Sequence, residues 1–174
     1  ATLTGAARVA VGPDLAPFYT DAEDFAGALS AAAPGAADPV WRMPFHAPYE
    51  AMIEPGIADL DNAPSGGFAG SITAALFLRR FTGQAARYAH FDIYSWQPKP
   101  EPGRAKGGLM QGPRAIIDAL PQVLQHGDPT PANLPGREGD DVVAIDWSCL
   151  GTGPVGGDLG YYLLSAREEF DPLL

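Results

Sequence analysis

The most regular apolar pattern of the chain runs over residues 65–81, where small residues lead into an almost wholly apolar stretch. Four apolar residues are spaced at i, i+3, i+4 and i+7: Ala74, Phe77, Leu78 and Phe81. Such spacings place side chains on one face of a helix. The adjoining face is apolar as well, so the pattern predicts a buried helix rather than one with a single apolar face.

Three glycines, Gly66, Gly67 and Gly70, come at the start of this predicted helix. Glycine lets neighbouring backbone approach closely, and the first turn of a helix carries N–H groups without helical partners. The glycines are therefore compatible with close helix–sheet packing or with a phosphate-binding turn. Close packing is the favoured interpretation, because a glycine pattern of this kind is by itself a weak indication of phosphate binding.

Two further helices are predicted in the first two thirds of the chain. Residues 20–33 carry an apolar stripe, and Thr20 with Glu23 matches a capping box. The second helix begins near Pro113, a favourable first-turn residue, and continues to Leu120.

Strands are predicted between these helices. Residues 2–11 indicate a strand or a strand–turn–strand, and residues 89–96 show the clearest alternation. That alternation sends one set of side chains to the same face, namely His90, Asp92, Tyr94 and Trp96. Helices that alternate with short strands indicate an α/β layered domain.

The character of the chain changes after Leu120, and residues 120–124 are the candidate domain boundary. A polar loop over 125–133 is followed by a short predicted strand over 142–145 and a glycine-rich loop over 150–157. Asp158 then precedes the apolar stripe of a last helix, reaching Ala166.

Composition excludes several classes of protein. The 174 residues carry a net charge of −10, which argues against a nucleic-acid or anionic-membrane surface. No apolar run approaches the ~20 residues of a membrane span. The one cysteine, Cys149, excludes an internal disulfide and fits a reducing, cytoplasmic compartment. The sequence begins at Ala1 without a basic-then-apolar signal segment, and we expect this start to lie inside a domain.

The first two thirds of the chain, about residues 1–120, resemble the C-terminal catalytic domain of the leucyl aminopeptidase (cytosol aminopeptidase) family. Five runs carry the resemblance, at residues 1–6, 38–44, 58–62, 65–78 and 89–94. The resemblance implies an α/β/α domain on a mixed sheet and a site with two divalent metals, Mn or Zn. It also implies release of N-terminal amino acids from peptides and a hexamer.

The resemblance also shows what the 174 residues lack. The family's signature Asn-Thr-Asp-Ala-Glu-Gly-Arg is absent, and the family's metal ligands and catalytic lysine and arginine precede the segment that matches Ala1. Two-metal hydrolysis needs several anionic ligands. The resemblance implies that residues 1–120 retain the surface of the active site that faces the substrate. Thr2, Leu3 and Gly5 would lie beside the peptide backbone and Tyr94 near the side-chain pocket. We therefore expect residues 1–120 alone to be inactive.

Residues 121–174 resemble another family, the aminoglycoside phosphotransferases and related small-molecule kinases. The matching motifs are His126-Gly127-Asp128 followed by Asn133, then residues 144–147 and 156–159. The resemblance implies that Asp128 is the catalytic base and that Asn133 and Asp146 hold Mg²⁺ on ATP. The nucleotide-covering glycine loop and its lysine are absent. The chain is thus expected to be a mosaic of two incomplete catalytic domains, with a kinase-like C-lobe fragment appended. A phosphotransferase fragment and a non-catalytic folded domain are the alternative functions.

Other polar residues allow two interpretations each. His90 and Asp92 could bind a metal or act as an acid–base pair, but no third ligand is nearby in the sequence, so a structural histidine is favoured. Asp59 and Asp61 could be paired carboxylates or part of a turn. Tyr94 and Trp96 could line a side-chain pocket or pack against a helix.

Overall fold

A computed structural model describes residues 1–54, 56–134, 136–138, 141–159 and 161–162. The chain divides into two compact units, Ala1–Ala119 (unit 1) and Leu120–Leu174 (unit 2). No helix among the described residues is long and apolar enough to cross a membrane.

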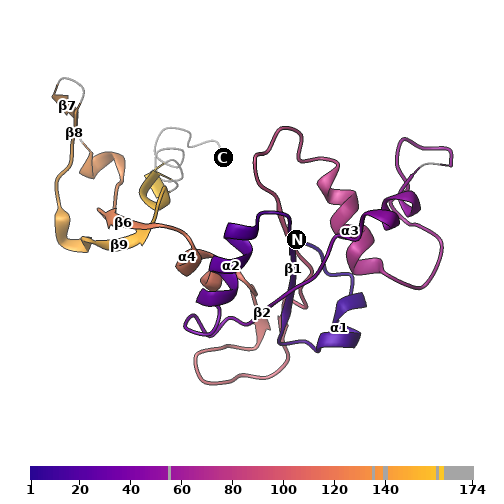
Figure 1. Ribbon diagram of the computed structural model, residues 1–174. Helices are drawn as coiled ribbons and strands as arrows, with labels where there is room; N and C mark the ends of the chain where they lie inside the picture. The colour runs from indigo at the N-terminus through magenta and orange to yellow at the C-terminus, as the bar shows by residue number, and fades with distance from the viewer. Residues whose placement is uncertain (55, 135, 139–140, 160, 163–174) are drawn as a thin grey trace, which may run out of the picture. The chain divides into compact units, whose positions relative to one another are not determined.

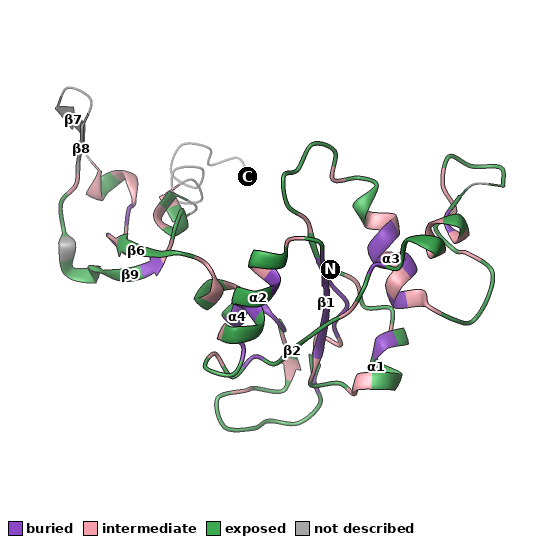
Figure 2. Ribbon diagram, viewed as in Figure 1, coloured by how far each residue is buried: buried purple, intermediate pink, exposed green. Residues whose placement is uncertain are grey.

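Unit 1 is built on a mixed three-stranded sheet in the order β2-β1-β3 (Figure 1). The central strand β1 (Ala16–Thr20) pairs in parallel with β2 (Val40–Arg42) and antiparallel with β3 (Ala89–Phe91). Phe18 lies opposite Phe91 across the antiparallel pair. Every residue of β1 is buried, as Figure 2 shows along its whole length.

Helices cover both faces of this sheet, and Figure 1 shows β1 between α2 and α3. On one face, α2 (Glu23–Ala32) and α4 (Pro113–Ala119) pack on a cluster formed by Ala16, Phe18, Ala26, Leu29, Ala33, Phe91, Ile93 and Ala115. On the other face, α3 (Gly70–Arg79) and the 3₁₀ helix η1 (Ala47–Met52) enclose Tyr19, Phe45, Ile53, Ala75 and Leu76. The predicted α/β class is confirmed, and a helix forms within residues 65–81. Its burial is only partial: Ser71, Thr73, Ala75 and Leu76 are buried, whereas the predicted face of Ala74, Phe77 and Leu78 is half-buried and Phe81 lies exposed beyond the helix.

The strand expected over residues 2–11 is wrong for most of its length. Only Thr2 pairs with β3, because its N–H donates to the Phe91 carbonyl at 2.8 Å and its carbonyl accepts from Ile93 N–H at 2.9 Å. Gly5 then turns the chain with a φ of 74°, and helix α1 (Ala6–Val11) follows. Alanine at three of its six positions favours the helix.

Two other local predictions fail in unit 1. The strand expected over 89–96 is divided: β3 ends at Phe91, and Ser95, with a φ of 59°, precedes β4 (Trp96–Gln97), which pairs with β5 (Gly107–Gly108). The capping box does not form: α2 starts after Ala22 without a side-chain cap. The hydroxyl of Thr20 instead donates to the Tyr88 carbonyl at 2.8 Å.

Unit 2 contains two small antiparallel sheets. The first pairs β6 (Gln122–Gln125) with β9 (Gly151–Pro154), and the second pairs β7 (Gly136–Glu138) with β8 (Asp141–Val143). The glycine-rich loop expected over 150–157 is therefore partly a strand. Backbone pairing with β6 requires no large side chains, so composition alone did not reveal β9.

Two 3₁₀ turns, η2 (Pro131–Asn133) and η3 (Trp147–Cys149), lie between the strands of unit 2. Residues 157–159 are helical, which agrees with the helix start predicted at Asp158. Residues 163–166 of that predicted helix lie outside the described residues.

Candidate functional site

Three of the four residues expected to face a substrate border one cavity of unit 1. Leu3, Gly5 and Tyr94 line a space of about 250 Å³. Its remaining lining consists of Thr4, Arg8, Gly12, Leu15, Pro17, Asp92 and Ile93. The cavity therefore lies where the N-terminal segment, helix α1 and the end of β3 meet.

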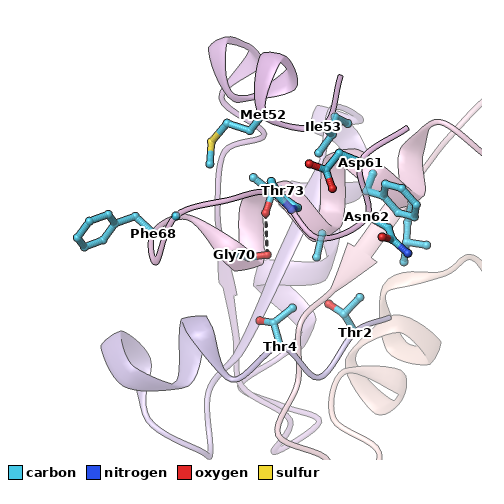
Figure 3. Close-up of a pocket in the computed structure, with 14 residues that line it drawn as sticks. Thr2, Thr4, Met52, Ile53, Asp61, Asn62, Phe68, Gly70 and Thr73 are labelled. Atoms are coloured by element: carbon cyan, nitrogen blue, oxygen red, sulfur yellow. Dashed lines mark hydrogen bonds between the residues drawn. The ribbon is translucent and has the colours of Figure 1, made fainter. Parts of the chain in front are cut away.

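The fourth residue, Thr2, borders a second cavity of about 370 Å³, which shares Thr4 with the first. Figure 3 shows Thr2 and Thr4 on the same extended segment, with Asp61 across the cavity. The carboxylate of Asp61 accepts a hydrogen bond from Ala63 N–H at 2.9 Å. This local bond supports the interpretation of Asp61 as part of a turn.

Asp92 connects the N-terminal segment to β3 through both of its carboxylate oxygens. One oxygen accepts from the Thr2 hydroxyl at 3.0 Å and from the Thr4 N–H at 2.9 Å. The other accepts from the Thr4 hydroxyl at 2.5 Å. Asp92 is only 4% exposed, so these bonds replace the water that its charge loses on burial.

These contacts set the ionisation of Asp92. Burial acts to raise the pKa of its carboxyl group, but the bonds from Thr4, Ser71 and Thr2 outweigh burial and hold the pKa below its usual value. The carboxylate is therefore charged at neutral pH.

His90 is a buried histidine with partners on both ring nitrogens. Its Nε2 lies 2.8 Å from the Thr2 hydroxyl oxygen, and its Nδ1 lies 3.3 Å from the Tyr88 hydroxyl. Because the Thr2 hydroxyl donates its proton to Asp92, its oxygen accepts from Nε2–H. Burial lowers the pKa of His90 to about 4, which keeps the ring neutral. These contacts support the structural interpretation of His90.

Arg8 and Gly5 shape the rim of the smaller cavity. The guanidinium carbon of Arg8 lies 4.5 Å from the centre of the Tyr94 ring, a cation–π contact. Gly5 has the left-handed conformation that a side chain would strain, and a Cβ placed there would lie 3.9 Å from the Arg8 guanidinium. Tyr94 therefore faces the cavity with one side of its ring covered by Arg8.

The two-metal site expected from resemblance is not supplied by the described residues. Among them, no group of three or more His, Cys, Asp or Glu side chains could hold a metal ion. Asp92 and His90 contact the N-terminal segment, but their polar atoms already form hydrogen bonds with Thr2, Thr4 and Tyr88. The residues that the structure describes therefore do not fit a pair of metal ions.

In unit 2, the structure brings Asp128 and Asn133 together. The side-chain amide of Asn133 donates to the carbonyl and to the carboxylate of Asp128, both at 3.0 Å. The backbone N–H of Ile145, the residue before Asp146, donates to the Asn133 carbonyl at 2.9 Å. Asp146 accepts a hydrogen bond from the Ser148 hydroxyl at 2.7 Å.

The loop that carries Asp128 is held from both sides. His126 Nε2 lies 2.7 Å from the Ile145 carbonyl. The carboxylate of Asp158 accepts from His126 N–H at 2.7 Å and from Gly127 N–H at 3.1 Å. A side chain at Gly127 would collide with the carbonyl oxygen of Cys149, so this turn needs glycine.

Thr4 is the residue that the sequence interpretation missed. It borders both cavities, and both its N–H and its hydroxyl donate to Asp92. A signal was available, because Thr2 and Thr4 are two residues apart and point to the same side of an extended segment. Their partner lies 88 positions away from Thr4, however, and spacing alone does not identify it.

Comparison with known proteins relates unit 1 to one family. Residues 1–117 match the model of the cytosol aminopeptidase family, catalytic domain. The chain is 43% identical over 93 residues to the cytosol aminopeptidase of Encephalitozoon cuniculi, covering 53% of this chain and 19% of that protein. It is 40% identical over 121 residues to a probable cytosol aminopeptidase of Trichormus variabilis, covering 68% and 24%.

Solved structures agree with this relationship. The cytosol aminopeptidase of Coxiella burnetii matches with a TM-score of 0.59 and 42% identity, over 67% of this chain and 25% of that chain. The bottromycin maturation enzyme BotP in complex with Mn matches with a TM-score of 0.60 and 30% identity, over 68% and 27%. The chain thus spans about a quarter of the length of most of these relatives. With two thirds of its residues matching the catalytic-domain model, the chain belongs to the cytosol aminopeptidase family.

Proposed function

We propose that unit 1 forms the substrate-binding side of a metal-dependent aminopeptidase site, which releases N-terminal amino acids from peptides. One observation carries the proposal: Leu3, Gly5 and Tyr94 surround one cavity within the part of the chain that matches the family. Leu3 is 67% exposed, so its side chain is accessible to a bound peptide.

The extended segment supplies the peptide-binding surface in this proposal. Leu3 and Gly5 offer backbone groups at the cavity rim, and an extended peptide can pair with such an edge. Thr2 anchors the segment, because its backbone N–H and carbonyl are bonded to Phe91 and Ile93. Tyr94 borders the space for the first side chain of the peptide. The aromatic ring and its covering Arg8 make this space amphipathic, because an apolar face lies next to a cation.

The metal ions of this proposal are held by residues other than the described ones. Support for a metal requirement comes from BotP, whose structure is a complex with Mn. Zn is the alternative ion. The names of the relatives support a cytoplasmic location. The hexamer implied by resemblance can be tested by light scattering of the purified chain.

A segment exchange tests the proposal. Residues 1–117 replace the matching segment of the Coxiella burnetii cytosol aminopeptidase, and release of leucine from leucyl-p-nitroanilide is measured with Mn²⁺. We expect the exchanged protein to turn over substrate and the 174-residue chain alone to remain inactive with Mn²⁺ or Zn²⁺. Chelator-sensitive turnover by the chain alone would overturn the assignment of the metal ligands to other residues. A folded but inactive exchanged protein would contradict the substrate-binding role.

A second candidate function belongs to unit 2, and the bond from Asn133 to Asp128 favours it. A phosphotransferase needs a carboxylate base beside an amide that holds Mg²⁺. Asp128, Asn133 and Asp146 have these chemical types, and the His126 contacts order their loop. The glycine loop and lysine that cover the nucleotide are absent from the sequence, so we expect weak ATP binding or none. A micromolar, Mg²⁺-dependent affinity for ATP that Asp146→Ala abolishes would establish a nucleotide site. Failure of both assays would leave a non-catalytic folded domain.

A further inference from the structure

The N-terminal segment of unit 1 has little backbone support beyond Thr2. Thr2 makes the two backbone bonds that connect the segment to β3. Within the described part of the chain, the Thr4 N–H has the Asp92 carboxylate as its partner, and the Thr4 hydroxyl bonds to the same carboxylate. Asp92 therefore holds the segment where the sheet no longer does.

We propose that Asp92 is the positioning residue of the substrate-facing segment formed by residues 2–5. This inference rests on the proposed function of that segment. Asp92 also borders the 250 Å³ cavity, but both of its carboxylate oxygens already accept hydrogen bonds, so in this proposal it makes no bond to the peptide. It acts through Thr2 and Thr4, whose hydroxyls bind its two oxygens.

The alternation of side chains along an extended chain explains how Asp92 can set the direction of Leu3. Successive side chains point to opposite sides, so fixing Thr2 and Thr4 on one side directs Leu3 to the other. Leu3 is exposed, whereas both threonines bind Asp92, and Leu3, Thr4 and Asp92 all border the 250 Å³ cavity. The same bonds bring the chain to Gly5, where it turns into α1.

The bonds also decide against a direct chemical role for Asp92. A general base needs an oxygen available to the substrate proton. From the segment, one oxygen of Asp92 accepts two hydrogen bonds and the other accepts a short one, and Ser71 is a further hydrogen-bond partner of the carboxylate. Hydrogen bonds to a charged group are among the stronger ones, so removal of this acceptor has a large local effect.

The test uses the ¹⁵N-labelled 174-residue chain and three groups of variants. Asp92→Asn replaces an acceptor oxygen by a donor group. Thr4→Val removes only the hydroxyl, and Thr4→Ser restores it. Asp38→Asn is the matched control, because Asp38 is also buried, with 3% exposure, and also accepts backbone N–H bonds, but from Gly112, Arg114 and Ala115. Two quantities are measured: hydrogen exchange of the Thr4 amide, and the Kd for leucyl-glycine from amide shifts.

We expect Asp92→Asn to accelerate Thr4 exchange by about tenfold or more and to weaken leucyl-glycine binding by a similar factor. Thr4→Val should weaken binding in the same direction, and Thr4→Ser should retain the affinity of the parent chain. Asp38→Asn should leave Thr4 exchange and the Kd within about twofold, although it lowers the stability of unit 1.

Two outcomes separate this inference from the function on which it rests. If the parent chain binds leucyl-glycine and Asp92→Asn changes neither the Kd nor Thr4 exchange, the positioning role is overturned. If the parent chain does not bind the peptide, the proposed function fails, and Thr4 exchange alone decides whether Asp92 positions the segment. Equal effects of Asp38→Asn and Asp92→Asn on the Kd would also overturn the inference, because the loss would then follow stability.

Discussion

The two units hold their candidate sites in different ways. In unit 1, a charged network lies at the end of a sheet whose two faces are packed by apolar clusters. Among the unit 2 side chains whose burial the structure describes, Pro129 is buried but no larger apolar side chain is, and the loop that carries Asp128 is ordered by bonds from His126, Asn133 and Asp158. Several of its large apolar side chains, including Leu124 and Leu150, are exposed.

This difference teaches which interactions fix a site in each unit. Apolar burial supplies most of the stability of a domain, whereas one hydrogen bond contributes about 1 kcal/mol net. Unit 1 can therefore lose one polar contact and remain folded, while the same loss in unit 2 removes a main support of its loop. The variants below test this contrast.

The largest effect is expected for Leu29→Ala in the first apolar cluster of unit 1. Leu29 is fully buried, and truncation of such a side chain costs about 3 kcal/mol or more through lost burial and a residual cavity. Leu124→Ala in unit 2 is the control, because Leu124 is exposed and should change little. Urea unfolding followed by amide signals of each unit measures both. Equal losses in the two variants would break the comparison.

The second-largest effect is a pH dependence of the unfolding free energy, caused by His90. Its pKa falls from 6.5 to about 4 in the folded chain, so the unfolded state binds a proton first as the pH drops. Stability is full above pH 6.5 and falls between pH 6.5 and 4, by at most about 3 kcal/mol. Asp92, whose pKa is lowered, adds its loss only below its usual value of 3.8.

His90→Gln isolates this contribution. The variant should flatten the unfolding free energy of unit 1 between pH 6.5 and 4, as measured by urea titrations at several pH values. A parent chain whose unit 1 stability is constant over this range would contradict the burial of a neutral His90.

A smaller effect, about 2 kcal/mol, is expected for Asp158→Asn in unit 2. The change weakens the acceptor of His126 N–H and Gly127 N–H, so hydrogen exchange of these two amides should accelerate. Exchange in unit 1 should not change. The exposed Asp118 of α4 provides the control, and Asp118→Asn should leave both amides as they are. Protection of Gly127 that survives Asp158→Asn would show that another contact holds the loop.

The smallest effect is expected for Arg8→Gln at the rim of the cavity. An exposed cation–π contact is worth about 0.5 kcal/mol, and Arg8→Lys should keep part of it. The ring proton shifts of Tyr94 and the unfolding free energy measure the loss. Unchanged Tyr94 shifts in Arg8→Gln would show that the stacked arrangement does not persist in solution.

The sequence revealed the elements whose pattern is local. Helix α3 was predicted because its apolar spacing is regular, and the His90 face of β3 was predicted from alternation. The central strand β1 was not predicted, because a strand buried on both faces shows no alternation and Pro17 interrupts its apolar run.

The candidate site was also predictable only in part, because some of its contacts join residues that are far apart in the sequence. Family resemblance identified Leu3, Gly5 and Tyr94, and the structure places all three around one cavity. The bond from Thr4 to Asp92 joins residues 88 positions apart, and only the folding of the chain brings them together.

The most direct test of the central claim is a map of where a leucyl peptide binds on the whole chain. The ¹⁵N-labelled 174-residue protein is titrated with leucyl-glycine, and amide shifts are followed in both units. We predict saturable shifts at Leu3, Gly5 and Tyr94, with no shifts in residues 122–134 of unit 2. Absence of shifts at all three residues, or saturable shifts confined to unit 2, would contradict the account.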